Sequence, residues 1–158
     1  MIKLQKITWD NWEECMRLEV TEEQDNYIAS NMYSLAQSYV AQLNDELPPM
    51  TYAICNDDVL IGFTMFGYDT ADENEHDNEP CYFIARFMID KRHQNKGFGK
   101  QAMVEVLEYI KSYPQGAAAS VYLSYEPSNV VAQKLYKSLG FVETGNICEG
   151  EIVAKLAF

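Results

Sequence analysis

The sequence has 158 residues, the length of one ordinary domain, and its 47% hydrophobic and 23% charged residues are typical of a globular chain. Its longest nearly apolar run, residues 59–68, is far shorter than the roughly 20 residues that a membrane span needs. The first ten residues lack the apolar core of a signal peptide. We therefore predict one domain over residues 1–158 that is cytoplasmic and has no membrane partner.

The formal net charge of −12 is unevenly distributed along the chain. Residues 1–80 carry 17 acidic and three basic side chains, whereas residues 81–158 carry seven acidic and nine basic ones. Nucleic acid is disfavoured as a partner, because binding a phosphate backbone relies on a basic surface. The skew between the halves instead indicates two kinds of ligand surface.

The four cysteines and two histidines form no metal-binding pattern. The cysteines, at positions 15, 55, 81 and 148, include no C-x-x-C pair, which excludes the common zinc spacings and the thioredoxin-type motif. Two histidines are too few for a histidine-based site. We expect reduced, buried thiols and no metal.

The first elements in chain order are a strand and two helices. A short strand is predicted over residues 3–8, followed by a helix that Asp10 caps, with Glu13 completing a capping box. Residues 30–43 form a second predicted helix. One face of that helix is apolar and carries Met32, Leu35, Tyr39 and Leu43.

Strands dominate the middle of the chain. Residues 51–55 and 59–68 are predicted strands, joined by a turn at 56–58. The acidic run 69–79 is predicted to be a loop, and residues 82–89 form a buried strand.

A helix should then begin near Gly97 and finish before Pro114, with a strand over 120–125 after it. A further helix over 128–139 is closed by Gly140, and a hairpin of 142–147 and 151–156 completes the chain. Hairpins that alternate with helical crossovers indicate an α/β fold with a mixed sheet. The first of these helices is expected to bury Ala102, Met103, Val106, Leu107 and Ile110.

The segment 89–100 has the features of an anion-binding loop. A strand that runs through a glycine-containing loop into a helix presents unpaired backbone N–H groups at the positive end of the helix dipole. Gly97 and Gly99 let the backbone approach a phosphate closely. Gly-x-Gly alone would indicate only a glycine-rich helix start, but the surrounding charge favours phosphate. The cationic side chains are Arg86, Lys91, Arg92, Lys96 and Lys100.

Two motifs in the second half resemble the GNAT superfamily of acetyl-CoA-dependent N-acetyltransferases. Gln94-x-x-Gly97-x-Gly99 after a hydrophobic strand is similar to the pyrophosphate-binding signature of that family. A second stretch is similar to its N-x-x-A-x-x-L-Y-x-x-x-G-F pattern. Together the motifs cover residues 82–146, and the resemblance implies a mostly antiparallel sheet of about seven strands flanked by about four helices. The residues that match the second pattern are Asn129, Ala132, Leu135, Tyr136, Gly140 and Phe141.

The resemblance implies acetyl-CoA as co-substrate and assigns roles to its motif residues. Phe87, Met88 and Ile89 would pair with the pantetheine arm, and the Met88 N–H would stabilise the oxyanion. Tyr136 would protonate the leaving thiolate as general acid, and the helical spacing places Asn129 beside it against the cofactor. The pyrophosphate would be held by Gln94, Asn95, Lys96, Gly97, Phe98, Gly99 and Lys100.

Within the superfamily, the chain is most similar to the spermine/spermidine acetyltransferases, in residues 83–90 and in the segment 22–36. This implies a small cationic amine as acceptor, and clustered carboxylates in the acidic first half would attract it. Glu22, Glu23 and Glu75 are the expected substrate-binding residues.

The general base stays unassigned, and so does the choice among several functions. Many relatives carry a carboxylate immediately before the arginine of the central strand, but this chain has Ala85 there. Glu79, another acid of the 69–79 loop or a water chain could take the proton. Another acceptor (a protein N-terminus, a lysine or an aminoglycoside) and a non-catalytic acyl-CoA-binding module are the competing functions. A homodimer is an open alternative to a monomer.

Overall fold

The computed structural model describes residues 1–72 and 77–158, and the order of elements in it agrees with the predicted order. Two short 3-10 helices, η1 and η2, are added to the predicted elements. The elements are β1 (Ile2–Gln5), α1 (Trp12–Arg17), η1 (Glu22–Tyr27), α2 (Asn31–Asn44), β2 (Met50–Asn56), β3 (Val59–Asp69), β4 (Cys81–Ile89), η2 (Lys91–His93), α3 (Phe98–Ile110), β5 (Ser120–Tyr125), α4 (Val130–Ser138), β6 (Val142–Cys148) and β7 (Glu151–Ala157).

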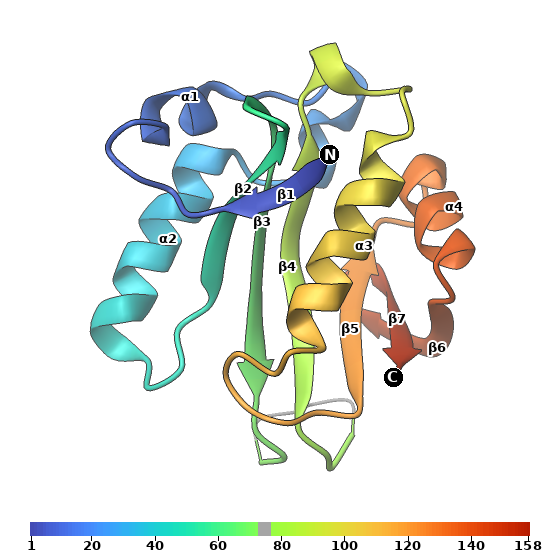
Figure 1. Cartoon of the computed structure of the whole chain (residues 1–158). Helices are drawn as coiled ribbons and strands as arrows, with labels where there is room; N and C mark the ends of the chain where they lie inside the picture. Colours follow the sequence, from blue (N-terminus) through green and yellow to red (C-terminus); the bar gives the residue numbers. More distant parts are fainter. Residues whose placement is uncertain (73–76) are drawn as a thin grey trace.

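One mixed sheet organises the described residues, with the strand order β1-β2-β3-β4-β5-β7-β6. Every neighbouring pair is antiparallel except β4 and β5, which are parallel. Helices α1 and α2 cover one face of the sheet and α3 and α4 the other (Figure 1). The fold is thus the mixed, mostly antiparallel α/β architecture that the sequence predicts.

Helix α3 buries the five side chains that its periodicity predicts, all 5% exposed or less. Four of them pack with Phe66, Tyr82, Val121 and Phe141 in the largest hydrophobic cluster of the described residues, and Ala102 packs in a smaller cluster with Ile89. A second cluster, on the other face, joins α1 to β2, β3 and β4. The site described below lies between these two packed layers, which hold its strands in place.

Helix α2 contradicts the simple amphipathic interpretation. Its apolar residues Met32, Tyr39 and Leu43 are 61%, 65% and 67% exposed, while Asn31, Ser34 and Ser38 are buried. Asn31 Nδ2 donates to the Cys15 carbonyl at 2.9 Å, which ties the start of α2 to α1. Tertiary contacts therefore turn the polar face of this helix toward the sheet.

Two further local expectations are corrected. Asn11, not Asp10, is the N-cap of α1; its Oδ1 accepts a hydrogen bond from the Thr8 N–H at 2.8 Å, and its side chain caps no helical N–H. Cys148 is exposed, whereas the other three cysteines are buried, and all four are free thiols.

Within residues 1–72 and 77–158, no helix is both long and apolar enough to cross a membrane. No group of three or more His, Cys, Asp or Glu side chains among the same residues is arranged to hold a metal ion.

Candidate acetyl-transfer site

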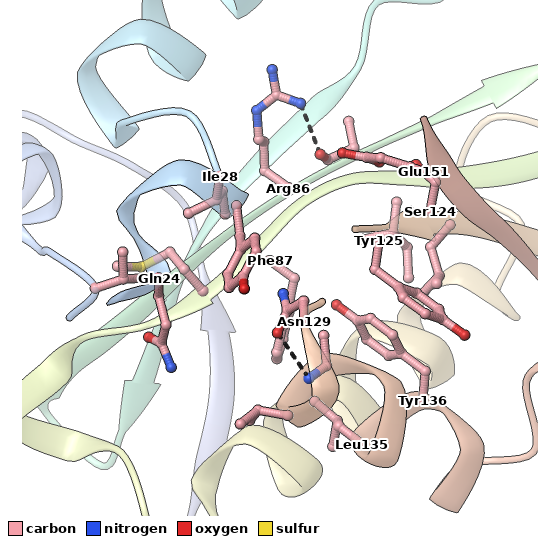
Figure 2. A pocket seen from close by; sticks show the side chains of 18 of the residues that line it. Gln24, Ile28, Arg86, Phe87, Ser124, Tyr125, Asn129, Leu135, Tyr136 and Glu151 are labelled. Atoms are coloured by element: carbon pink, nitrogen blue, oxygen red, sulfur yellow. Dashed lines mark hydrogen bonds between the residues drawn. The ribbon is translucent and has the colours of Figure 1, made fainter. Parts of the chain in front are cut away.

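Strands β4 and β5 separate part of the way along the sheet, and a cleft opens between them. They pair only at Tyr82 with Val121 and at Phe83 with Tyr122. Beyond these pairs the strands diverge around a cleft of about 880 Å³. Its walls come from β4 and η1 on one side and from β5, α4 and the β6–β7 hairpin on the other (Figure 2).

A β-bulge in β4 determines which side chains face each side of this cleft. Arg86 pairs with Met65, but Ile84 pairs with Phe66, so Ala85 is an extra residue in β4. As a result, Ala85 packs with the α1 side of the sheet, and Arg86 Nη2 reaches Gln37 Oε1 of α2 at 3.2 Å. Arg86, which the sequence groups with the loop cations, therefore lies at the α2 side of the cleft.

The register of β4 on β3 fixes the direction of the backbone groups. Asp90 N donates to the Ile61 carbonyl at 2.8 Å. In an antiparallel pair, every second residue directs its backbone N–H and C=O toward the partner strand, so the N–H and C=O of Met88 also face β3. Phe87 and Ile89 therefore direct their N–H and C=O groups toward the cleft; the Ile89 carbonyl accepts from Gln94 Nε2 at 2.9 Å. The expectation that the Met88 N–H is the oxyanion donor is thus wrong, because this N–H points toward β3 and not into the cleft.

The loop between β4 and α3 presents a row of unpaired donors. Among the described residues, the backbone N–H groups of residues 97–100, around the N-terminus of α3, donate no hydrogen bond to the protein. Gly97 is the N-cap of α3 with a left-handed backbone (φ 79°), and Asn95 is also left-handed (φ 60°). A Cβ added at Gly99 would make only ordinary van der Waals contacts with the protein, at 3.9 and 4.0 Å. Gly99 lines the cleft, so the space left by its missing side chain belongs to the cleft.

Asp90 holds the start of this loop, and the sequence did not single it out. Its side chain is 2% exposed. Its Oδ1 accepts from Arg92 N at 3.0 Å and from Arg92 Nε at 2.7 Å, and its Oδ2 accepts from Glu19 N at 3.0 Å. Burial alone would raise the pKa of Asp90, but these hydrogen bonds outweigh it and lower the pKa.

The cations of the loop are largely engaged by the protein itself. Lys91 pairs with Glu19 at 2.9 Å, Arg92 pairs with Asp90, and Lys96 Nζ donates to the Arg92 carbonyl at 3.0 Å. In the described part of the chain, Lys100 makes no ion pair. An anion at this loop would therefore be held mainly by the backbone N–H groups and the helix terminus.

Replacing Gly97 with alanine should weaken acetyl-CoA binding by roughly ten-fold. A Cβ meets no close neighbour there, but the left-handed φ costs a non-glycine residue about 1–2 kcal/mol, and relaxing it turns the N–H groups of the loop away. The affinity would be measured by calorimetry.

Gly145→Ala is the matched control, because Gly145 has φ 86° with open space around it and is not in the cleft lining. Both variants should lose similar stability in thermal unfolding, and only Gly97→Ala should lose affinity. Equal affinities in the two variants would contradict the role of the loop.

Tyr136 projects from α4 into the cleft (Figure 2). It is 9% exposed, and its ring packs against Tyr125 and Phe141 with centroids 5.8 Å from each. Burial first, and then the negative charge of Glu151 and the nearby Tyr125, raise the pKa of Tyr136 far above its usual range. The hydroxyl is therefore protonated at any physiological pH.

Asn129, the other expected residue of this helix, is the N-cap of α4 and lines the cleft. Its Oδ1 accepts from Ala132 N at 3.2 Å, so its amide nitrogen is the group that faces the cleft. On the same helix, Leu135 packs against the core and Val131 is 69% exposed.

The two expected substrate acids within the described residues do not line the cleft. Glu22 and Glu23 are exposed on η1 and are not part of its lining, and Glu75 lies outside the described residues. Their neighbour Gln24 lines the cleft instead, where it exchanges amide hydrogen bonds of 2.7 and 3.2 Å with Gln94. Glu79 is also absent from the lining.

Two acids that sequence reasoning missed do line the cleft, Glu149 and Glu151. Both belong to the β6–β7 hairpin, and both are more than 60 residues from Ala85 in the sequence. Only the turn signal Glu149-Gly150 marks this segment in the sequence. Their position depends on the order β4-β5-β7 in the sheet.

Comparison with known proteins identifies the relatives of this fold. A protein-family model, described as the acetyltransferase (GNAT) family, matches residues 5–141 of the chain. The spermine/spermidine N(1)-acetyltransferase of Bacillus subtilis strain 168 is 25% identical over 146 residues, which cover 92% of this chain and 91% of that protein.

Solved structures with different acceptors are similar to a comparable degree. The Vibrio cholerae spermidine N-acetyltransferase in complex with CoA and spermine has a TM-score of 0.69 at 20% identity, covering 99% of this chain and 94% of that one. The aminoglycoside acetyltransferase AAC(6')-Ib in complex with coenzyme A has a TM-score of 0.74 at 13% identity, covering 99% of this chain and 95% of that one. Arabidopsis thaliana NAA60 in complex with a bisubstrate analogue has a TM-score of 0.68 at 17% identity, covering 99% of this chain and 98% of that one. The fold alone therefore does not select the acceptor.

Proposed function

The chain belongs to the acetyltransferase (GNAT) family, and we propose that it transfers the acetyl group of acetyl-CoA to a primary amine of a polyamine such as spermine or spermidine. Acetyl transfer is supported by three features that occur together in one cleft. They are the unpaired N–H groups of the loop, the backbone N–H and C=O groups of β4 that face the cleft, and the Tyr136 hydroxyl. The names of the relatives in B. subtilis and V. cholerae support the acceptor class.

The residues present fit acetyl-CoA. A diphosphate needs several convergent donors without competing partners, which the N–H groups of residues 97–100 offer at the positive end of α3. A pantetheine arm carries amides, and the N–H and C=O groups that Phe87 and Ile89 direct toward the cleft are suited to pair with them. The space at Gly99 and the amide of Asn129 border the same path.

The register also indicates an oxyanion donor. The N–H that stabilises a thioester oxygen must be fixed and must point into the cleft. Phe87 meets both conditions, because it follows the bulge and its N–H faces away from β3. We assign this role to Phe87 in place of Met88.

Tyr136 acts as the donor to the leaving sulfur. Because its pKa is raised, complete proton transfer from the phenol to a thiolate is uphill. The hydroxyl is better suited to relay a proton. It gives its own proton to the sulfur while it takes one from the attacking nitrogen, which is acidic because forming the C–N bond has made it positively charged. The phenol is then regenerated without an intermediate phenolate.

A second, smaller cavity supports a polar acceptor. It has a volume of about 330 Å³, lies between α2 and the sheet, and shares Phe83, Ala85 and Arg86 with the cleft. Its α2 wall consists of polar and small apolar side chains, with Asp45 at the C-terminal end of the helix; the α2 residues are Gln37, Ser38, Val40, Ala41 and Asn44. Both a carboxylate and a helix C-terminus attract cations, which agrees with a distal ammonium group of a polyamine.

The test is CoA thiol release from acetyl-CoA with a panel of amines at equal concentration: spermine, spermidine, putrescine, lysine, an aminoglycoside and a basic peptide. Release that is fastest with spermine or spermidine is the expected result. Release with only the aminoglycoside or peptide would keep the transferase and overturn the acceptor, in line with the structures of similar fold. Acetyl-CoA binding without release from any amine would favour a non-catalytic module.

A further inference from the structure

Acetylation of an alkylamine requires a proton acceptor, and β4 does not supply one. An alkylammonium has a pKa of about 10.4, so only about one molecule in a thousand is neutral at pH 7. Ala85 occupies the bulge of β4, and its neighbour Arg86 is a cation. The described acids that line the cleft, Glu149 and Glu151, both come from the opposite wall.

Glu151 is the better placed of these two acids. It is half-buried, whereas Glu149 is exposed in the hairpin turn. As the first residue of β7 it lies next to the end of β5, where Ser124 pairs with Val153 and Tyr125 with Ile152. Figure 2 shows Glu151 and Ser124 on the wall that faces Phe87 and Arg86.

A hydrogen bond fixes the carboxylate of Glu151. Ser124 Oγ donates to its Oε2, and Oε1 makes no hydrogen bond within the described residues. Ser124 is therefore a positioning residue, and the second oxygen stays available to an incoming ammonium. The charge of Glu151 also contributes to the raised pKa of Tyr136, which indicates that the two groups share one electrostatic environment.

We propose that the Glu151 carboxylate binds the acceptor ammonium and takes its proton before the nitrogen attacks. The proposal rests on the proposed function and adds the base that the sequence leaves unassigned. It supplies a proton acceptor to a cleft in which β4 offers only Ala85 and the cation Arg86.

The protons balance along this route. The acceptor enters with three protons on its nitrogen, and the first passes to Glu151 and from there to water. The neutral nitrogen then forms the C–N bond while the C–S bond of the thioester breaks, and the second proton passes through the Tyr136 hydroxyl to the sulfur. The products are an amide that keeps the third proton, a thiol and one free proton.

The test is the pH dependence of kcat/KM for the preferred amine in Glu151→Gln, at saturating acetyl-CoA. With Glu151 as the base, the ammonium form of the amine is the form that reacts. We therefore expect kcat/KM of the wild type to be nearly flat between about pH 6.5 and 9, below the amine pKa of about 10.4. Without this carboxylate only the neutral amine reacts, so kcat/KM should rise about ten-fold per pH unit toward the amine pKa of about 10.4. We expect a deficit of about 10²–10³-fold at pH 7 that narrows as the pH rises.

Other groups around Glu151 must not produce this slope. Arg86 is always charged, burial raises the pKa of Tyr122, and burial with the Glu143 contact raises the pKa of Tyr125 to about 12. A Cys148→Ser background removes the thiol beside the turn. The titratable or charged groups that line the cleft near Glu151 are Arg86, Tyr122, Tyr125, Tyr136, Cys148 and Glu149.

Glu105→Gln is the charge-matched control and should keep the flat profile, because Glu105 is exposed on α3 and is not part of the cleft lining. Glu151→Asp should also stay flat, at a reduced rate, which keeps the proposal testable if the Gln variant is unstable. A Gln variant with a lower rate but a profile parallel to the wild type would overturn the proposal. Failure of the wild-type protein to acetylate any amine would overturn the proposed function instead, and the two failures are therefore distinguishable.

Discussion

Replacing Tyr136 with phenylalanine should lower kcat by roughly 10²–10³-fold and leave the affinity for acetyl-CoA within about two-fold. The hydroxyl is the only group removed, and within the described residues it makes no hydrogen bond to the protein that its loss would break. The ring would keep its packing against Tyr125 and Phe141. The loss should therefore fall on the passage of the proton to the sulfur, measured as steady-state turnover beside calorimetric binding.

Tyr125→Phe is the control for this effect. Tyr125 also lines the cleft, but its hydroxyl donates to Glu143 Oε1 at 3.0 Å on the far side of the ring from the reaction. Its variant should keep turnover within about three-fold and lose about 1 kcal/mol of stability. Unchanged turnover in Tyr136→Phe would remove Tyr136 from the mechanism.

Replacing Asp90 with asparagine should lower the free energy of unfolding by about 2–4 kcal/mol at neutral pH. Both carboxylate oxygens accept hydrogen bonds, so an amide places an N–H₂ group against a donor in either orientation. The loop that follows would lose its attachment to Glu19, and acetyl-CoA affinity should fall as well. Chemical denaturation across a pH series would measure the stability.

The pH dependence of this stabilisation follows from the lowered pKa of Asp90. The contribution is complete above the unfolded pKa of about 3.9 and is lost as the pH falls through the lower folded value. The wild type and Asp90→Asn should therefore converge in stability below about pH 4. Asp58→Asn, which removes an exposed ion pair with Lys3 at 3.6 Å, should change stability by less than about 0.5 kcal/mol at any pH. A constant difference between wild type and Asp90→Asn down to pH 2 would contradict this account.

Most of the fold was predictable because its signals are local. The buried face of α3 follows from a 3.6-residue period, and the turn at Asp57 and the end of α4 at Gly140 follow from residues suited to positive φ (53° and 96°). The loop before α3 was equally visible, since glycine spacing and a helix start occupy neighbouring positions. The two motifs of the family also lie in single segments, and the match over residues 5–141 agrees with them.

The sequence by itself thus determined the order of elements, the family and the position of the glycine-containing loop before α3. Tertiary structure alone decided the rest: the inward polar face of α2, the outward N–H of Phe87 and the position of Glu151. A hydrophobic period marks a face but not its neighbour, and one bulged residue in β4 reverses which residues face the cleft. Glu151 reaches the cleft because β7 pairs with β5, a contact between distant segments that no local pattern encodes.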